Sequence, residues 1–247
     1  MTAPPPVRSQ SSYFWLCLAL SATVFYGFSI TYFQPMLAGA YPESSTTVHV
    51  HGWTFFLFYL LLPLQACLIR ARRVAWHRAL GTLSLGLAAA MIGTGMVVIG
   101  TQMNLSLQPD GSPFWQGMGL AVFSTLILFT LFFTRGILAR RDRDRHRRFM
   151  LLASAGGMGA AGFRVMTQVL GFSIAAGVVG ILIPNLFIVA AILIDRRRGR
   201  PFHPVYRTGL PLSVGLEVAA FLITPTPVGR ALAEALASVG RALAPLY

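Results

Sequence analysis

Two histidines that are far apart in the chain share the same local setting. His77 is followed by Arg78 and His146 by Arg147, and an apolar run begins directly after each pair. Two imidazoles from different helices at one depth could bind a haem iron or another transition metal. The neighbouring arginines disfavour a bare cation but suit haem propionates or a phosphate. We predict a cofactor site at His77 and His146; two interfacial histidines are the alternative.

A second group of polar residues surrounds an arginine inside an apolar run. Ionisable residues within membrane spans are costly and indicate function by default. Arg164 stands deep in such a run, Gln168 follows it by one helical turn, and His51 opens another run at the same end. We predict a pocket formed by His51, Arg164 and Gln168 that holds a quinone-like headgroup, an anionic lipid or a small acid. The alternative is an arginine that extends outward and makes structural hydrogen bonds.

A third group is predicted at the depth of the only carboxylate within the apolar runs. Glu217 shares its depth with Gln65 and with Asn185, which follows Pro184. These three residues could form an inner polar layer. In the alternative, a protonated Glu217 bonds to Asn185 and has a structural role alone. An ion pair between Glu217 and Arg164 is a weaker expectation, because their depths differ by about 12 Å at 1.5 Å per residue.

The elements that must position these residues are long apolar helices. Hydrophobic residues make up 55% of the chain and charged residues 11%, against about 25% charged residues in soluble domains. About 20 apolar residues span a bilayer. The sequence predicts an all-α polytopic membrane protein whose seven spans are Tyr13–Leu37, His51–Ile69, Ala79–Thr101, Trp115–Leu138, Phe149–Leu170, Phe172–Ile194 and Leu210–Thr224.

Arginine clusters predict the orientation of these spans. All 20 basic residues are arginine, and three clusters, Arg70–Arg78, Arg140–Arg148 and Arg196–Arg200, alternate with loops that lack Lys and Arg. By the positive-inside rule the N-terminus is cytoplasmic and the C-terminus lies outside. A net charge of +13 could indicate nucleic-acid binding, but its confinement to short loops argues against it. Anionic membrane lipids are the expected partners.

The last residues are predicted to form a separate amphipathic helix. Thr226 is a suitable N-cap, Pro227 suits the first helical position, and leucines and alanines then recur at helical spacing. This divides the chain into a transmembrane domain, residues 1–224, and an interfacial helix, residues 225–247, on the outer membrane surface. A second protein or another copy of the chain could bind this helix.

One cofactor is excluded by composition. Seven predicted helices suggest a comparison with rhodopsins, but a retinal Schiff base requires a lysine. The chain contains none, and its predicted orientation is the inverse of theirs.

Several motifs resemble a known group of proteins. His77-Arg78-Ala79-Leu80-Gly81 has the form H-R-x-L-G, and His146-Arg147-Arg148-Phe149-Met150 has the form H-R-R-x-M. With His51 and Arg164, they make the chain similar to a family of uncharacterised bacterial membrane proteins, a domain of unknown function. The likeness covers roughly the second to fifth predicted helices. It implies a multi-pass bacterial inner-membrane protein, and it implies no activity.

Three classes of function remain open, and the sequence does not decide whether the protein is an enzyme. The first is a redox or cofactor-binding membrane protein that uses a haem, a metal or a quinone. The second is a non-enzymatic binding or transport protein for an anionic lipid or small acid. The third is a structural subunit of a membrane complex.

Overall fold

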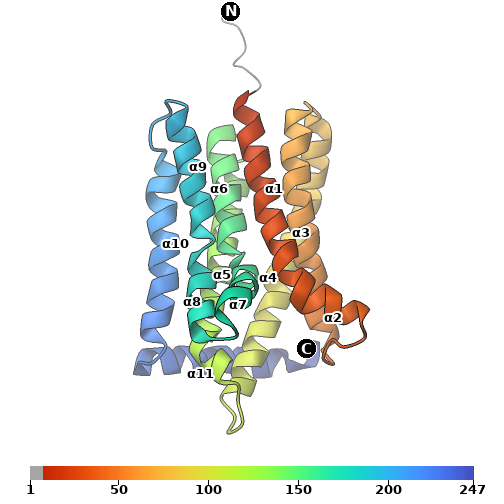
Figure 1. Cartoon of the computed structure of the whole chain (residues 1–247), viewed down its shortest axis with the longest axis vertical. Helices are drawn as coiled ribbons and strands as arrows, with labels where there is room; N and C mark the ends of the chain where they lie inside the picture. Colours follow the sequence, from red (N-terminus) through yellow and green to blue (C-terminus); the bar gives the residue numbers. More distant parts are fainter. Residues whose placement is uncertain (1–7) are drawn as a thin grey trace, which may run out of the picture.

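Helices form all the regular secondary structure of residues 8–247, which are the residues described by the computed structural model (Figure 1). This confirms the all-α prediction. The helices are α1 (Arg8–Phe28), α2 (Gln34–Leu37), α3 (Thr46–Arg70), α4 (Val74–Ser106), α5 (Pro113–Leu138), α6 (Arg143–Gly156), α7 (Gly159–Leu170), α8 (Ile174–Leu182), α9 (Asn185–Arg197), α10 (Pro204–Ile223) and α11 (Pro227–Leu243). A π-helical segment, Ser29–Phe33, joins α1 to α2, and a 3₁₀ turn, Ala244–Leu246, follows α11.

Many of these helices are long and apolar enough to cross a membrane. Five segments meet this description, and two bent helix pairs, α6 with α7 and α10 with α11, raise the number to at most seven if each pair is one span. The apolar runs therefore predicted where long apolar helices lie, although most of these helices extend beyond the predicted bounds. The last span, for example, begins at Pro204 instead of Leu210.

The connections that carry arginine clusters lie at one end of the bundle, and three connections without such clusters lie at the other. The turns α3–α4, α5–α6 and α9–α10, which carry the arginine clusters, lie at the end of the bundle where α1 begins (Figure 1). The connections α2–α3, α4–α5 and α7–α8 lie at the opposite end, beside α11. We call these the arginine end and the α11 end.

Two predicted spans are broken near the middle. The axes of α6 and α7 differ by 48°, and α8 gives way to α9 at Ile183 and Pro184. Next to these breaks, α7 and α8 approach so closely that a Cβ atom at Gly162 would lie 2.0 Å from the carbonyl oxygen of Gly180. The backbones can therefore meet only because both positions are glycine.

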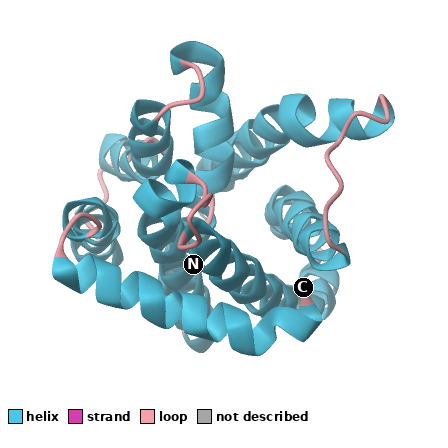
Figure 2. Ribbon diagram, turned by 90° about the horizontal axis from the view of Figure 1, so that it is seen from below, coloured by secondary structure: helices cyan, strands magenta, loops and turns pink. Residues whose placement is uncertain are grey.

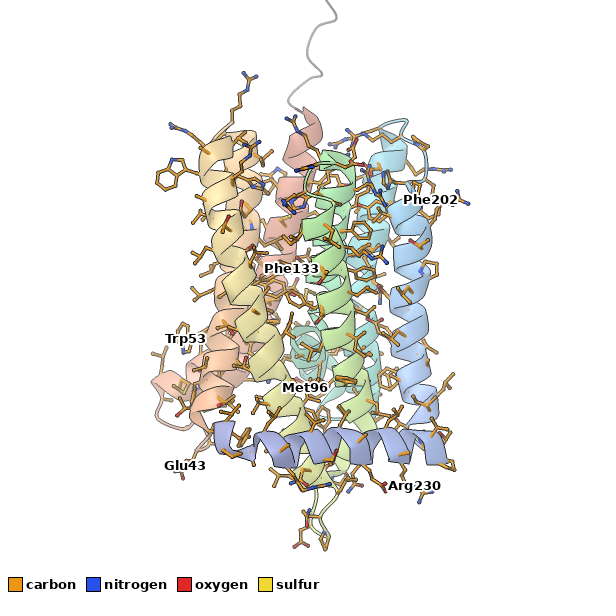
Figure 3. All side chains as sticks on the ribbon, turned by 180° about the vertical axis from the view of Figure 1, so that it is seen from behind. Glu43, Trp53, Met96, Phe133, Phe202 and Arg230 are labelled. Carbon is orange, nitrogen blue, oxygen red and sulfur yellow. The ribbon has the colours of Figure 1, made fainter. Side chains whose placement is uncertain are left out.

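Helix α11 runs across one end of the bundle (Figures 1, 2 and 3). Thr226 caps it by accepting a hydrogen bond from the Gly229 N–H at 3.2 Å, as predicted. A Cβ atom at Gly240 would lie 2.1 Å from the carbonyl oxygen of Gly100 in α4, so the two backbones are in contact. The buried residues of α11, which include Leu236 and Ala237, therefore pack against the bundle.

Candidate functional site

A cavity of about 440 Å³ lies within the bundle toward the α11 end. Its wall includes aromatic residues from several helices and from the turn between α7 and α8: Phe28, Phe55, Phe56, Trp115, Phe163 and Phe172. It extends to Tyr41 and Ser112, in the loops at the α11 end, and inward to Gly157 at the break between α6 and α7. Its volume and apolar wall are typical of small-molecule sites.

Arg164 on α7 is the cationic residue of this cavity wall. Its Nη1 donates to the Ala160 carbonyl oxygen at 3.0 Å, so the side chain folds back toward the start of α7. The guanidinium lies 4.2 Å from the centre of the Phe28 ring. Its Nε is buried and has no hydrogen-bond partner, and no ion pair among the side chains described, those of residues 12–247, includes Arg164. The cavity wall therefore carries a positive charge without a carboxylate partner.

His51 on α3 lines the same cavity. Its Nδ1 lies 3.1 Å from the Thr94 hydroxyl, which itself donates to the Ala90 carbonyl oxygen at 2.6 Å. Because that hydroxyl already donates to a carbonyl oxygen, it accepts from Nδ1, which therefore carries a proton. Gly95 makes room for the ring, because a Cβ atom there would lie 3.1 Å from His51 Cε1. The structure brings the predicted pair His51 and Arg164 to one cavity.

Gln168 does not join them, which corrects the predicted pocket. It is exposed near the end of α7 and is not part of the cavity wall. Long helical side chains lean toward the start of their own helix. Arg164 therefore reaches Ala160, while Gln168 begins one turn farther away.

His77 and His146 also lie together, at the arginine end. Their ring centres are 6.4 Å apart and their planes are nearly perpendicular, at 85°. His146 Nδ1 lies 2.7 Å from the Gly136 carbonyl oxygen. Because a carbonyl only accepts, this nitrogen carries a proton and Nε2 is free to bind a metal, as in many histidine ligands.

Gln65 fixes His77 in a different way. In the amide orientation that satisfies all its neighbours, Gln65 Nε2 donates to His77 Nδ1 at 2.5 Å, and its oxygen accepts from the Gly81 N–H at 3.0 Å. His77 then carries its proton on Nε2, which suits a hydrogen-bond donor better than a metal ligand. Among residues 12–247, whose side chains the structure describes, no group of three or more His, Cys, Asp or Glu side chains could hold a metal ion.

The predicted inner layer forms only in part. Asn185 Nδ2 donates to Glu217 Oε2 at 2.6 Å, and the Glu217 residue is 1% exposed. Gln65 is not part of this contact, because it lies one turn before the end of α3 and bonds to the first turns of α4. Glu217 and Arg164 do not pair among the described ion pairs, so that expectation was wrong.

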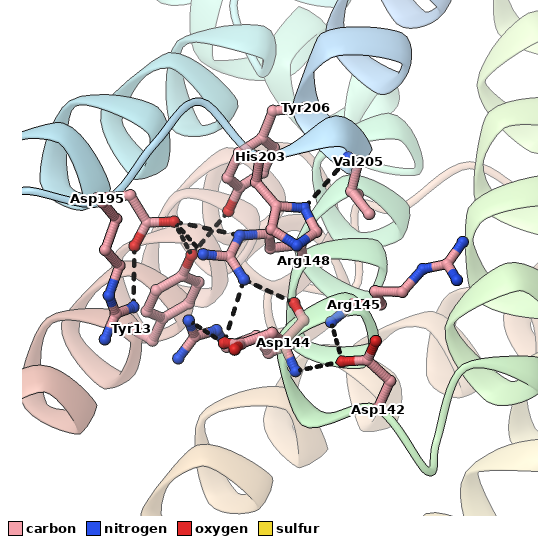
Figure 4. A network of polar contacts seen from close by, with 11 residues as sticks. Tyr13, Asp142, Asp144, Arg145, Arg148, Asp195, His203, Val205 and Tyr206 are labelled. Carbon is pink, nitrogen blue, oxygen red and sulfur yellow. Dashed lines mark hydrogen bonds and ion pairs between the residues drawn. The ribbon is translucent and has the colours of Figure 1, made fainter.

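A buried ionic cluster at the arginine end was not predicted (Figure 4). Arg148 on α6 donates to Asp195 Oδ2 on α9 from Nη2 at 2.6 Å and from Nε at 3.2 Å. Tyr13 on α1 donates to the same oxygen at 3.2 Å and lies 2.8 Å from the Tyr206 hydroxyl on α10. Arg200 pairs with Asp195 Oδ1 at 3.1 Å. The cluster links four helices, and its pairing explains why Asp195 is tolerated in an apolar helix.

Comparison with known proteins gives no match, whether with family models, curated proteins or solved structures. The family resemblance of the histidine–arginine motifs stays a prediction.

Proposed function

We propose that this is a multi-pass membrane protein that binds a small amphipathic molecule in the cavity beside Arg164. The observation that carries the proposal is the buried, unpartnered Nε of Arg164 in an otherwise largely apolar wall. An unpaired charge removed from water is costly unless a ligand or partner compensates it. A polar ligand head beside Arg164 and an apolar body against the aromatic rings would satisfy both parts of the cavity.

The proposal includes an orientation. If each bent pair contributes one span, seven helices cross the membrane and the arginine end faces the cytoplasm by the positive-inside rule. The cavity then lies in the outer half of a bacterial inner membrane, and α11 lies along the outer surface. Lipids surrounding the exposed apolar side chains are the expected partners, and the ligand would come from the membrane or its outer face.

Native mass spectrometry can test the binding function. The protein purified in a mild detergent should carry an additional small-molecule mass, and Arg164→Gln should weaken its retention. Val98→Trp, which places a large side chain in the cavity wall, should exclude it. Arg207→Gln is the matched control, because Arg207 is exposed on α10. Equal occupancy in all four proteins would refute the proposal.

A haem or metal at His77 and His146 is the second candidate. The ring separation of 6.4 Å favours it, because two imidazoles that face one iron at about 2 Å would have centres roughly this far apart. It requires His77 to move its proton from Nε2 to Nδ1 and Gln65 to turn its amide. A Soret band that is lost in His77→Ala and in His146→Ala would support the haem. A sample with neither chromophore nor bound metal would overturn both forms.

A further inference from the structure

We infer that the cavity ligand is a phenol, an aromatic molecule with a hydroxyl group, and that Tyr32 and His49 accept its proton. The inference rests on the proposed binding function and adds the chemical class of the ligand and a proton transfer. It connects two features of the site, the unpaired cation in the cavity wall and a tyrosine–histidine pair that begins in the same wall.

Tyr32 connects the cavity to His49. Tyr32 lines the cavity and is 5% exposed, and its hydroxyl lies 2.9 Å from His49 Nδ1. His49 stands in the first turn of α3, is half-buried and is not part of the cavity wall. Tyr41 packs against both, with its ring centre 5.0 Å from that of Tyr32 and 5.8 Å from that of His49. The pair therefore reaches from the cavity wall to a less buried imidazole.

The backbone that positions Tyr32 is unusual. Tyr32 is the buried residue of the π-helical segment Ser29–Phe33, and such segments are rare and frequently occur at functional sites. Phe28 precedes Tyr32 by four residues, about one helical turn, and its ring centre lies 4.2 Å from the guanidinium of Arg164. Tyr32 and Arg164 therefore reach the cavity at nearly the same height along α1.

The bond between Tyr32 and His49 can pass a proton. When His49 Nδ1 carries no proton, the Tyr32 hydroxyl donates to it, and when Nδ1 is protonated, it donates to the Tyr32 oxygen. A ligand hydroxyl beside Tyr32 can thus give its proton to the Tyr32 oxygen while Tyr32 gives its own to Nδ1. One O–H bond of the ligand breaks, one N–H bond forms at His49, and Tyr32 is unchanged at the end. Arg164 balances the charge of the phenolate that remains.

Other ligand heads do not use both features. A carboxylic acid has already lost its proton near neutral pH, so it gives the pair none to accept. An aliphatic alcohol does not ionise in this range, and an oxidised quinone has no hydroxyl proton. A phenol has a proton to give, and its anion can pair with Arg164. Imidazole is the side chain suited to take up that proton near neutral pH.

The aromatic residues of the wall suit the body of such a ligand. One group lies on α1 and α3, where the ring centres of Phe28 and Phe56 are 5.1 Å apart. Another lies on α5, on α7 and in the turn after α7, where the ring centres of Phe114, Phe163 and Phe172 are 4.8–5.5 Å apart. Both groups line the cavity. A planar aromatic body can stack on these rings or contact their edges.

Two probes with the same body test this inference. 4-Nitrophenol and 4-nitroanisole differ in that only the phenol can ionise, and its phenolate absorbs visible light that the neutral phenol does not absorb. Equilibrium dialysis of the purified protein in a mild detergent at neutral pH, with empty micelles as the blank, measures binding, and absorbance measures the ionised fraction. We expect both probes to bind. The phenolate-to-phenol ratio of bound nitrophenol should be about tenfold above that of the free probe, because a nearby opposite charge changes an ionisation by at least this factor.

Matched variants separate proton transfer from a structural role of the pair. His49→Asn can keep a hydrogen bond to Tyr32 but cannot take up a proton, so the phenolate ratio should fall severalfold while nitroanisole binding stays unchanged. Tyr32→Phe should lower the ratio in the same way. His51→Asn is the control, because it removes the other imidazole of the wall and can keep the bond to Thr94; the ratio should not change.

The outcomes distinguish this inference from the binding function. A wild-type ratio equal to that of the free probe, a ratio unchanged in His49→Asn, or a fall in His51→Asn alone would overturn the proton transfer. Nitroanisole would still bind in each of these cases, which leaves the binding function intact. Binding of neither probe, together with no co-purified ligand, would overturn the binding function itself.

Discussion

Removal of the Asp195 carboxylate should destabilise the fold strongly. The side chains of Asp195 and Arg148 are each 3% exposed, and Asp195→Ala would leave the guanidinium buried without its main partner. Loss of one member of a buried ion pair costs about 3–5 kcal/mol. Because Arg148 keeps a contact with Asp144 at 3.3 Å, we expect the lower limit, about 3 kcal/mol. This corresponds to a more than hundredfold change in the unfolding equilibrium.

The assay is equilibrium unfolding in mixed micelles by titration with sodium dodecyl sulfate, followed by circular dichroism. Asp144→Ala is the matched control, because this carboxylate is 64% exposed although it also contacts Arg148; its loss should cost under about 1 kcal/mol. The double variant Asp195→Ala, Arg148→Met should be at least as stable as Asp195→Ala alone, since the orphaned charge is gone. Equal stability of Asp195→Ala and Asp144→Ala would refute this reasoning.

Three further predictions concern other contacts. Glu217→Gln should retain the bond to Asn185 and unfold within about 1 kcal/mol of the wild type. Glu217→Leu should cost about 1–3 kcal/mol, because the Asn185 amide then loses its Glu217 acceptor and keeps only the Leu182 carbonyl oxygen; the same titration measures both, and equal losses would contradict the role of the bond. Gly240→Ala should loosen the packing of α11, because the added Cβ has no room against α4. The loosening would be detected as faster proteolysis after Arg230 or Arg241. Gly215→Ala is the control, because its Cβ meets open space and the proteolysis rate should not change. Burial, together with the charge of Arg148, lowers the pKa of His203 from its ordinary 6.5. The folded state therefore disfavours the protonated ring, and stability should fall as the pH drops through about 6.5. His203→Asn, which can still cap α10, should remove this component, and an unchanged pH profile would contradict it.

The sequence predicted the helices and the pairing of His51 with Arg164 for related reasons. Apolar runs of spanning length can be read directly, and a polar residue inside such a run needs a compensating environment. Two such residues near the same end of the predicted bundle therefore suggested a common pocket. Gln168 was misplaced because helical spacing indicates a shared face but not the direction in which a side chain extends.

The Asp195 cluster could not be found in this way. Asp195 stands next to Arg196 at the end of an apolar run, where it reads as part of a charged loop. Its partner Tyr13 is 182 residues away, and no local pattern links them. The sequence feature that could have indicated the cluster is an acidic residue, Asp195, at the end of an apolar run and directly before an arginine cluster. The break between α6 and α7 was also missed, because a glycine-rich stretch is compatible with close helix packing as well as with a bend.

A crystal structure of the protein grown in a lipid phase, without added ligand, tests the central claim most directly. The account predicts electron density in the cavity for a molecule whose polar head lies within hydrogen-bonding distance of Arg164 and whose body contacts the ring of Phe28. A cavity closed by its own side chains, with Arg164 paired to a carboxylate of the chain, would contradict it.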